Sequence, residues 1–341
     1  MSKDIFNFSA GPAVIPDSVI DKINLGLQDF DRGMSIIEVS HRSDAFKEFA
    51  KSSESSLRNL LNISEEYSVL FLQGGATHQF ALIPMNFSKN GVIDYLVTGA
   101  WSKKASEYAN KVANVNIVSD SSSNNFTNVA DPKKWNISDD PDYFFYCANE
   151  TVHGLELHNP IESDSPVICD MSSTIASRPI DINKYDLVFA GAQKNLGIAG
   201  LTILIIKNKL LSVCNKELLP MFDYSAHAEE GSMLNTSPVF SWYVSGLIFD
   251  WIIEQGGVGM MGKVNMEKSS ILYNYIDESS FYSNPVSKPY RSWMNIPFIL
   301  ARDDLENDFI QSAEDEGLFN LKGHRTVGGM RASVYLSLIH I

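Results

Sequence analysis

The sequence is poor in the features that define several large classes of protein. Its 341 residues include only three cysteines, Cys147, Cys169 and Cys214, and none of them forms a Cys-x-x-Cys pair. An odd number of scattered cysteines fits a disulfide framework poorly, so we expect buried thiols in a reducing compartment. No run reaches the ~18 apolar residues of a membrane-spanning helix. The first residues, MSKDIFNFSAGP, contain no apolar secretion signal. We therefore expect a cytoplasmic protein that binds no membrane.

Positive charge is also scarce. The chain has 27 lysines and arginines against 41 aspartates and glutamates, which gives a formal net charge of −14. A nucleic-acid binder needs a basic footprint, so we expect no nucleic-acid partner. A small anionic substrate is not excluded, because a few local arginines can outweigh the field of the whole protein.

Several catalytic motifs are missing as well. The seven histidines show no metal-ligand spacing, so no metal is expected, and the absence of a G-x-S-x-G elbow disfavours a serine hydrolase. One glycine motif needs weighing, because residues 257–262 read GVGMMG and would suit a nucleotide-binding protein. The motif follows a predicted helix rather than a strand, and Val264 stands where a P-loop carries Ser or Thr. A glycine turn at the end of a helix is therefore the favoured interpretation.

What the sequence does contain is a regular alternation of apolar runs and helical stretches. Five apolar runs end in small or polar residues and a sixth follows them; they are 69–72, 95–97, 143–146, 167–168, 187–189 and 201–206. Runs without polar alternation are typical of a sheet covered on both faces, and alternation with helices predicts a largely parallel α/β sheet. Ligands bind at the carboxyl ends of such strands. The Ser/Asn-rich stretch 119–128 is expected to be a surface loop.

The second part of the chain has a different pattern. Apolar residues between 244 and 252 repeat at helical spacing and predict a helix that closes the large domain. Beyond about residue 260, the pattern predicts a helix, a strand, a helix and a strand at 264–275, 293–300, 305–316 and 331–335. We expect these elements to form a smaller α+β domain.

Two ionisable residues follow neighbouring predicted strands. Asp170 ends the run 167–168, and Lys194 comes one strand–helix–strand unit later, just past the run 187–189. Parallel neighbours would bring both side chains to the same edge of the sheet. A pyridoxal phosphate enzyme needs this pair, a lysine for the Schiff base and an acid against the pyridine nitrogen. Alone the pair is a weak signal, since Asp170 could equally cap a helix and Lys194 could be solvated.

Two further segments suit the same cofactor. Residues 73–77, Gln-Gly-Gly-Ala-Thr, lie between a predicted strand and a predicted helix. Backbone N–H groups at a helix start bind anions, so this turn is a candidate phosphate site to which Thr77 could add a hydroxyl. Trp101 follows another predicted strand end and could stack on an aromatic ring. Taken singly, the two segments could also be a tight turn and a core tryptophan.

Eight segments in a fixed order carry a specific resemblance. They are FNFSAGPAVIP (6–16), EVSHRS (38–43), LFLQGGATHQF (70–80), CANETVHG (147–154), DMSSTIASRPID (170–181), AGAQKNLGIAGLT (190–202), GSMLNTSP (231–238) and KGHRTVGGMRAS (322–333). With these segments the chain resembles the phosphoserine aminotransferases, a class V family of the fold-type-I pyridoxal phosphate enzymes.

The resemblance implies a fold and an assembly. We expect an α/β fold with a large domain at 16–258, built on a mainly parallel seven-stranded sheet, and a small α+β domain from 1–15 and 259–341. The expected active unit is a homodimer whose two active sites are shared between the subunits. The family continues past the position of Tyr335 into a final helix, whereas residues 336–341 do not match. We therefore expect a truncated C-terminus and a less stable small domain.

The resemblance also implies the cofactor, pyridoxal 5′-phosphate, and its contacts. Lys194 would form the Schiff base and move the proton, and Asp170 would pair with the pyridinium nitrogen. The further expected contacts are Trp101 stacked on the ring, Thr151 at the phenolic oxygen, Ala76, Thr77 and Gln193 at the phosphate, and Asn235 and Thr236 reaching the phosphate from the partner subunit.

Substrate contacts follow from the same resemblance. His41, Arg42, His324 and Arg325 match the family's phosphate pocket, Arg331 matches its carboxylate clamp, and Ser9 is expected near the carboxylate. Guanidinium forks bind phosphate and carboxylate bidentately. The implied reaction is a ping-pong transamination in serine biosynthesis: glutamate leaves as 2-oxoglutarate, and 3-phosphohydroxypyruvate leaves as O-phospho-L-serine. Family members also act on 4-phosphohydroxy-L-threonine in vitamin B6 synthesis.

Several alternatives stay open. Another class V enzyme, such as a cysteine desulfurase, needs a mobile cysteine, but Cys147 and Cys169 lie at predicted strand ends and Cys214 in a helical stretch. An alanine–glyoxylate aminotransferase has no use for two His-Arg pairs. A nucleotide-binding protein would use the glycines at 257–262. A cofactor-binding protein that lost activity through truncation also remains possible on sequence alone.

Overall fold

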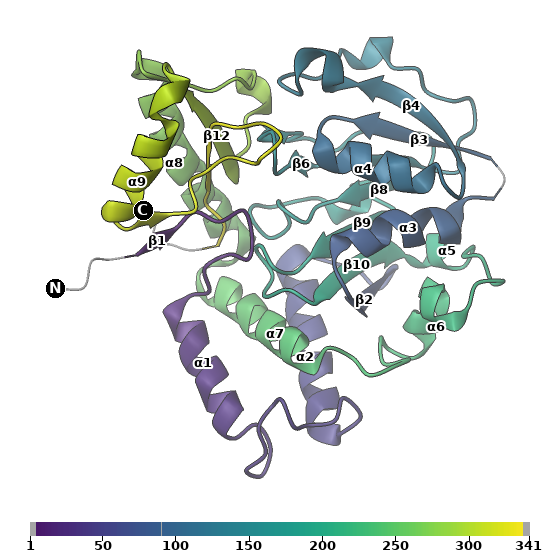
Figure 1. The fold of residues 1–341 in the computed structure, drawn as a ribbon. Helices are drawn as coiled ribbons and strands as arrows, with labels where there is room; N and C mark the ends of the chain where they lie inside the picture. The colour runs from purple at the N-terminus through teal and green to yellow at the C-terminus, as the bar shows by residue number, and fades with distance from the viewer. Residues whose placement is uncertain (1–4, 90, 337–341) are drawn as a thin grey trace.

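The chain folds around a seven-stranded sheet with a three-stranded sheet beside it (Figure 1). The computed structural model describes residues 5–89 and 91–336. The large sheet has the order β2-β10-β9-β8-β5-β3-β4, and its strands are β2 Tyr67–Gln73, β3 Val92–Val97, β4 Asn114–Asp120, β5 Phe144–Cys147, β8 Val167–Asp170, β9 Leu187–Gly191 and β10 Leu201–Lys207. Only β10 runs against its neighbours. The predicted, mainly parallel α/β sheet is therefore confirmed.

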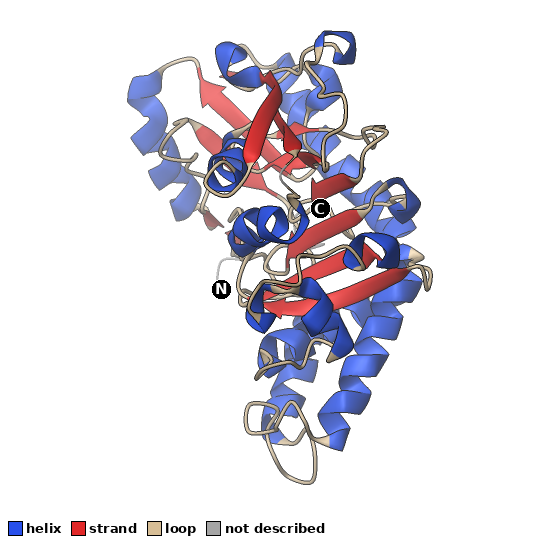
Figure 2. Ribbon diagram, turned by 90° about the vertical axis from the view of Figure 1, so that its right-hand side faces the viewer, coloured by secondary structure: helices blue, strands red, loops and turns tan. Residues whose placement is uncertain are grey.

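Both faces of the large sheet are covered by helices, as Figure 2 shows. Leu70 and Leu72 of β2 belong to a core shared with α3 (Ala76–Phe87) and α4 (Ala100–Ala109). Val69 and Phe71 face the other way, toward α2 (Asp44–Leu61) and α7 (Val239–Glu254). Phe71, for example, stacks on Trp242 of α7 with ring centroids 4.3 Å apart. Since both faces are buried, the central strands are mostly apolar, and this is why the sequence shows continuous runs.

The three-stranded sheet is antiparallel and has the order β11-β12-β14, with β11 at Tyr282–Ser283, β12 at Asn295–Leu300 and β14 at Met330–Ser333. It shares a core with α8 (Gly257–Glu278) and α9 (Glu306–Asp315). Near the N-terminus, β1 (Phe6–Asn7) pairs with β13 (Leu318–Phe319), so this N-terminal strand lies on the same side of the molecule as the three-stranded sheet. Figure 1 shows this body to the left of the large sheet.

Shorter elements complete the chain. They are α1 Asp17–Gln28, the hairpin strands β6 Asn149–Glu150 and β7 Leu155–Glu156, α5 Asn208–Leu211, α6 Tyr224–Glu229, and 3₁₀ turns at Ser121–Asn124, Pro132–Lys134, Ile182–Lys184, Pro220–Phe222, Lys288–Tyr290 and Asp303–Leu305. Cys214 lies beyond the end of α5, so its predicted placement in a helix was wrong. The predicted loop 119–128 begins inside β4, which ends at Asp120.

The glycine motif at 257–262 lies inside the first turns of α8. Gly256 and Gly257 have φ angles of 96° and 71°, and they form the turn that separates α8 from α7. A phosphate-binding loop of this type connects a strand to a helix, so the structure removes the nucleotide-binding alternative. Among the described residues, no helix is long and apolar enough to cross a membrane. Of the C-terminal stretch that departs from the family pattern, residues 337–341 lie outside the described residues.

The substitution Leu204→Ala tests how much the sheet depends on its antiparallel strand. Leu204 lies on β10 between β2 and β9 and is fully buried. We expect the free energy of unfolding in urea to fall by about 3 kcal/mol, because apolar contacts are lost and a cavity remains. Val112→Ala is the control, since that side chain is 54% exposed and its loss should cost less than about 0.5 kcal/mol. Equal effects of the two substitutions would contradict the placement of β10 at the centre of this core.

Candidate active site

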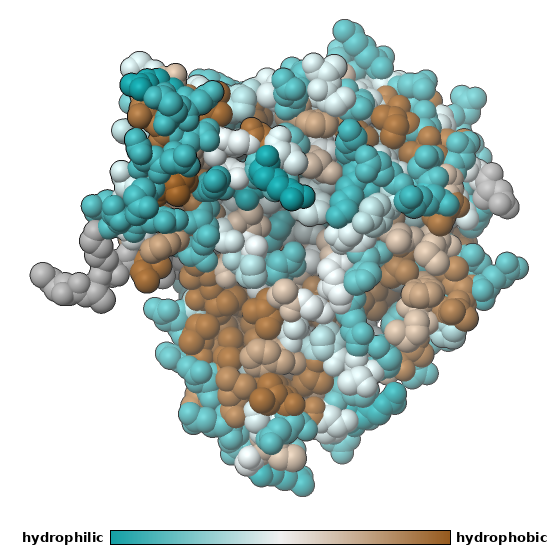
Figure 3. Space-filling model, in the orientation of Figure 1, coloured by the Kyte–Doolittle hydropathy of each residue, from teal (hydrophilic) through white to brown (hydrophobic). Residues whose placement is uncertain are grey.

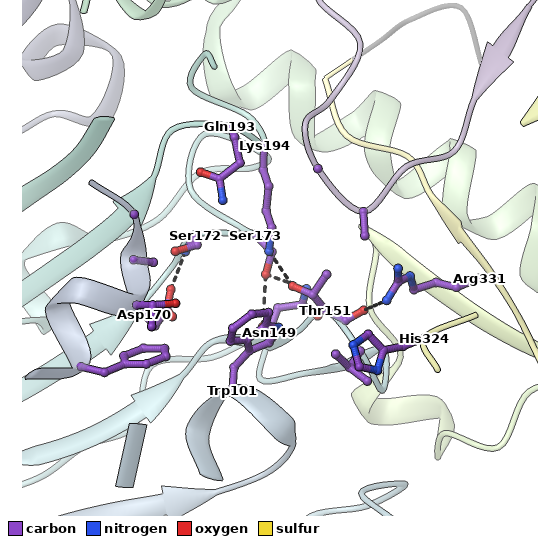
Figure 4. Close-up of a pocket in the computed structure, with 17 residues that line it drawn as sticks. Trp101, Asn149, Thr151, Asp170, Ser172, Ser173, Gln193, Lys194, His324 and Arg331 are labelled. Carbon is purple, nitrogen blue, oxygen red and sulfur yellow. Dashed lines mark hydrogen bonds between the residues drawn. The ribbon is translucent and has the colours of Figure 1, made fainter. Parts of the chain in front are cut away.

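The carboxyl ends of the parallel strands open on a cavity of about 340 Å³ (Figure 4). Its walls come from segments after β2, β3, β5, β8 and β9, from the N-terminal segment, and from the strand and loop that carry Arg331 and His324. The lining residues are Ala10, Gly11, Gly75, Ala76, Thr77, Phe80, Trp101, Asn149, Thr151, Val152, Asp170, Ser172, Ser173, Gln193, Lys194, His324 and Arg331. Segments far apart in sequence therefore meet at the sheet edge where ligands of α/β proteins bind.

Lys194 places its amine in the middle of this cavity. The residue is only 7% exposed, and its Nζ donates a hydrogen bond of 2.6 Å to Oγ1 of Thr151. Thr151 follows β6, so the hydroxyl and the amine come from different segments of the sheet edge. A buried amine held by one hydroxyl is well placed to react with a ligand in the cavity.

Asp170 ends β8 on the side of the cavity away from Arg331, as Figure 4 shows. Burial raises the pKa of this carboxyl, while hydrogen bonds from Ser172 and the charge of Lys194 act in the opposite direction. The backbone N–H of Ser172 donates to Oδ1 of Asp170 at 2.8 Å. A buried carboxylate of this kind favours a cationic partner in the cavity. As expected from neighbouring parallel strands, Asp170 and Lys194 line the same cavity.

Trp101 stands in the first turn of α4, and the helix start is fixed by Glu150. The Glu150 carboxylate accepts hydrogen bonds from the backbone N–H groups of Trp101 and Ser102, each at 2.9 Å. Burial raises the pKa of Glu150, and these hydrogen bonds partly offset that shift. The indole Nε1 of Trp101 is buried and has no partner among the described residues. Glu150 thus fixes the helix that presents this ring to the cavity.

The start of α3 forms another wall of the cavity. Gly75, Ala76 and Thr77 line it, and the first backbone N–H groups of a helix have no acceptor inside the helix. Gly74 has a φ angle of 95°, and a side chain there would collide with the ring of His78. The glycine therefore allows the tight turn from β2 into α3, and it leaves an anion site at the helix start.

The N-terminal segment closes the cavity over Lys194. Ala13 donates its backbone N–H to the carbonyl of Gln193 at 2.9 Å. Gly11 has a φ angle of 116°, and a Cβ there would lie 3.2 Å from Cγ of Lys194. A glycine is needed at this close approach. Ser9 lies just before these residues but does not line the cavity; its backbone N–H donates to Oδ1 of Asn7 at 3.0 Å.

Cationic groups line the side opposite Asp170. Nη1 of Arg331 donates to the carbonyl of Thr151 at 3.3 Å, and its Nε is buried without a partner among the described residues. Burial lowers the pKa of Arg331, and burial together with Arg331 and Arg325 lowers the pKa of His324. Arg325 itself is exposed and lies outside the cavity lining. This side of the cavity can bind an anionic group.

Besides Ser9 and Arg325, four more of the predicted site residues do not line the cavity of Lys194: His41, Arg42, Asn235 and Thr236. His41 and Thr236 line a second, separate cavity, and Nη2 of Arg42 contacts the carbonyl of Met233 at 3.4 Å. Asn235 lies beside Thr236 in the same loop. A single chain therefore divides the predicted site residues between two places.

The sequence analysis missed several lining residues. Asn149, Ser172 and Ser173 follow β5 and β8, and Phe80 lies on α3. All four lie inside the segments 70–80, 147–154 and 170–181, so the family resemblance of these segments could have identified them as site residues. None of the four side chains is ionisable, so they were less conspicuous than Asp170 and Lys194.

The cavity fits the cofactor that the sequence predicts. It holds an amine for a carbonyl group, a buried carboxylate for a ring nitrogen, and a helix start for a phosphate. The unpartnered Nε1 of Trp101 and Nε of Arg331 are further donors that a bound group could satisfy.

Other chemistries fit less well. Cys147, Cys169 and Cys214 are all buried, and burial raises the pKa of each thiol. A desulfurase needs an accessible, easily ionised thiol, so none of the three is suited to that role. Within the described part of the chain, no group of His, Cys, Asp or Glu side chains could hold a metal ion.

Known proteins similar to this chain point to one family. Residues 5–338 match the family model for class V aminotransferases. A phosphoserine aminotransferase of Pseudomonas fluorescens is 48% identical over 98% of this chain and 94% of its own length. The solved phosphoserine aminotransferase of Bacillus circulans subsp. alkalophilus superposes with a TM-score of 0.94 at 38% identity, covering 97% of this chain and 93% of the other. The pyridoxal phosphate-bound enzyme of Trichomonas vaginalis gives 0.93 at 37% identity, covering 97% and 95%.

The carboxyl of Asp170 should make the stability of the cofactor-free protein depend on pH. Its pKa is raised above the ordinary 3.8, so the folded protein loses stability as the pH rises from below 3.8 through the raised pKa. Asp170→Asn removes this loss, because an amide does not ionise. We expect the variant to gain stability relative to the wild type between pH 4 and pH 8, measured by urea unfolding. A difference that stays the same at both pH values would show that the carboxyl is not desolvated in solution.

Proposed function

Because the chain belongs to the class V aminotransferase family and its cofactor is pyridoxal 5′-phosphate, we propose that it transfers an amino group between glutamate and 3-phosphohydroxypyruvate. The products are 2-oxoglutarate and O-phospho-L-serine. The observation that carries the proposal is the meeting of the Lys194 amine, the Asp170 carboxylate and the Arg331 guanidinium in one cavity. Full-length similarity to phosphoserine aminotransferases supports this choice of substrates.

The residues around Lys194 supply the proton transfers. When bound, the cofactor withdraws electrons from the substrate's Cα and carries the amino group between the two half-reactions. Lys194 holds the cofactor through its amine, and once freed it accepts the proton from the substrate's Cα. The Thr151 hydroxyl, 2.6 Å from Nζ, orients this amine and can also bind the phenolic oxygen. Asp170 would hold a proton at the ring nitrogen of the bound cofactor, Trp101 would cover its ring, and the start of α3 with Gln193 would hold its phosphate.

The substrates are selected by cations. Arg331 binds the α-carboxylate that glutamate and phosphoserine share, since a guanidinium fork pairs with a carboxylate through two hydrogen bonds. His324 and Arg325 serve the distal end of the substrate, and Ser9 serves its carboxylate end. A phosphate or a second carboxylate can occupy that end, so one pocket serves both half-reactions. 4-Phosphohydroxy-L-threonine carries the same groups and is a second candidate substrate. The reaction would serve serine synthesis in the cytoplasm.

We further propose that the active unit is a homodimer in which each cavity is completed by the partner chain. His41, Arg42, Asn235 and Thr236 lie away from Lys194 within one chain, although the family pattern places them at the site. A two-fold dimer would bring them to the partner's cavity. Figure 3 shows an apolar area over the lower part of the molecule, where α1 and α7 lie. The exposed large apolar side chains of α1 and of the segment that follows it are Ile20, Leu25, Leu27, Met34 and Ile37. Such a patch supports an interface there.

The absorption of the bound cofactor tests the proposed reaction. Adding O-phospho-L-serine or glutamate to the purified holoprotein should shift the cofactor's visible band, whereas alanine should not, because alanine has no distal anion for the cationic end of the site. Lys194→Ala is the control and should show neither the original band nor its conversion by substrate. Equal conversion by alanine would point to a different class V aminotransferase, and a stable band with no conversion would leave cofactor binding without this activity.

Mixed dimers test whether the sites are shared. Lys194→Ala and Arg42→Ala should each be almost inactive, because each removes a group from both sites of a dimer. When the two variants are co-expressed with different tags, the purified mixed dimer should regain about half of the wild-type activity, since one of its two sites combines intact residues from both chains. If the mixed dimer stays as inactive as its parents, Arg42 acts on the cavity of its own chain.

A further inference from the structure

Tyr335 lies two residues past the end of β14, directly behind the cavity, and contacts two of its parts. The side chain is almost completely buried, at 2% exposure. Its hydroxyl donates a hydrogen bond of 2.9 Å to Oδ1 of Asn295. Its ring centroid lies 5.7 Å from Nζ of Lys194, within the range of a cation–π contact. No role follows for this tyrosine from the residues discussed so far.

The hydroxyl belongs to a buried polar network that joins the two sheets. Oδ1 of Asn295 also accepts a hydrogen bond of 2.8 Å from Nδ2 of Asn149, and Nδ2 of Asn295 donates to Oγ of Ser333 at 2.9 Å. Asn295 begins β12, Ser333 ends β14, and Asn149 begins the hairpin that leads to Thr151. The Asn295 amide orientation is fixed, because the oxygen has two donors and the nitrogen one acceptor.

This network controls where Arg331 lies relative to Lys194. Arg331 is part of β14, and its guanidinium contacts the carbonyl of Thr151, whose hydroxyl holds the Lys194 amine. The register of β14 on β12, together with the Asn149–Asn295 hydrogen bond, thus sets the separation between the guanidinium and the amine. Oδ1 of Asn149 is buried without a partner among the described residues, but the other hydrogen bonds of this network join the two segments and favour one arrangement of them.

We propose that Tyr335 is a positioning residue with two separable roles. Its hydroxyl, through Asn295, positions Arg331 to bind the substrate's α-carboxylate. Its ring holds the Lys194 amine by a cation–π contact when that amine is protonated and free of the cofactor. The proposal rests on the proposed function of the cavity. It adds a residue to the site that does not itself contact substrate or cofactor.

The variant Tyr335→Phe isolates the hydroxyl, since it keeps the ring. We expect the KM for glutamate to rise roughly fivefold, the effect of one lost hydrogen bond in a network, with kcat changed less than about twofold. The dissociation constant of glutarate, a dicarboxylate that cannot react, should rise in parallel when calorimetry follows its binding to the holoprotein. Asn295→Ala should act in the same direction and more strongly, because it removes all three side-chain hydrogen bonds of Asn295 in this network.

The variant Tyr335→Leu removes the ring as well. Beyond the effects of Tyr335→Phe, it should lower kcat by about threefold to tenfold, the range of a buried cation–π contact. A second readout does not depend on turnover. In holoprotein saturated with phosphoserine, acetic anhydride should label Lys194 about threefold faster in Tyr335→Leu than in Tyr335→Phe, because the amine loses the ring that it contacts. Peptide mass spectrometry measures the label.

Tyr67→Phe is the matched control. Tyr67 is also 2% exposed, and its hydroxyl donates to the carbonyls of Ile182 and Tyr185, outside the cavity lining. It should lower the melting temperature without changing KM, glutarate binding or labelling. If Tyr335→Phe behaves in the same way, the role of the hydroxyl is refuted; if the Phe and Leu variants give equal kcat and labelling, the role of the ring is refuted. Failure of the proposed function is recognised separately, as wild-type holoprotein whose band does not respond to glutamate or phosphoserine.

Discussion

The rest of the structure depends on a carboxylate and an amine that are both buried at the carboxyl edge of one sheet. Asp170 and Lys194 are each only 7% exposed. Burial disfavours the charged form of a carboxyl, and here it is offset only in part by Ser172 and Lys194. Such a pair persists only if rigid neighbours hold it, and a bound cation at the ring-nitrogen position removes part of the remaining cost. The cavity is thus organised to receive a positively charged aromatic ring.

The sheet supplies that rigidity because both of its faces are covered. Val69 and Phe71 pack on one side of β2 and Leu70 and Leu72 on the other, so the interior of this strand holds apolar side chains. The polar side chains that line the cavity follow the strand ends. The β6–β7 hairpin extends one of these ends toward the three-stranded sheet, and a Cβ on Gly154 would meet Pro297 and the carbonyl of Asn295. This close contact packs the hairpin that carries Thr151 against β12, which pairs with the strand of Arg331.

The parts of the structure that were predictable from sequence are those encoded by local pattern. The runs at 167–168 and 187–189 predict β8 and β9, and parallel pairing then predicts that Asp170 and Lys194 meet. The edge strand β4 escaped prediction because it mixes polar and apolar residues and only Val118 in it is buried. The separation of His41 from Lys194, and the pairing of Asn149 with Asn295, depend on packing between distant segments, which no local pattern encodes. The boundary between the two domains, placed near residue 258, stays a prediction.

The local cations also explain how a chain with a net charge of −14 can select an anion. Burial, and after it the charges of Arg331 and Arg325, lower the pKa of His324, so a protonated His324 is repelled by the two arginines before any anion is bound. An incoming carboxylate or phosphate relieves that repulsion and is therefore bound more strongly. The acidic residues elsewhere repel it only weakly, because solvent and salt screen their charges. Arg331 is buried, and its Nε is unpartnered among the described residues. The free-energy cost of removing this guanidinium from water therefore falls on folding and not on substrate binding. The site is therefore preorganised for a substrate that brings negative charge at both ends, and a neutral side chain would leave part of that charge uncompensated.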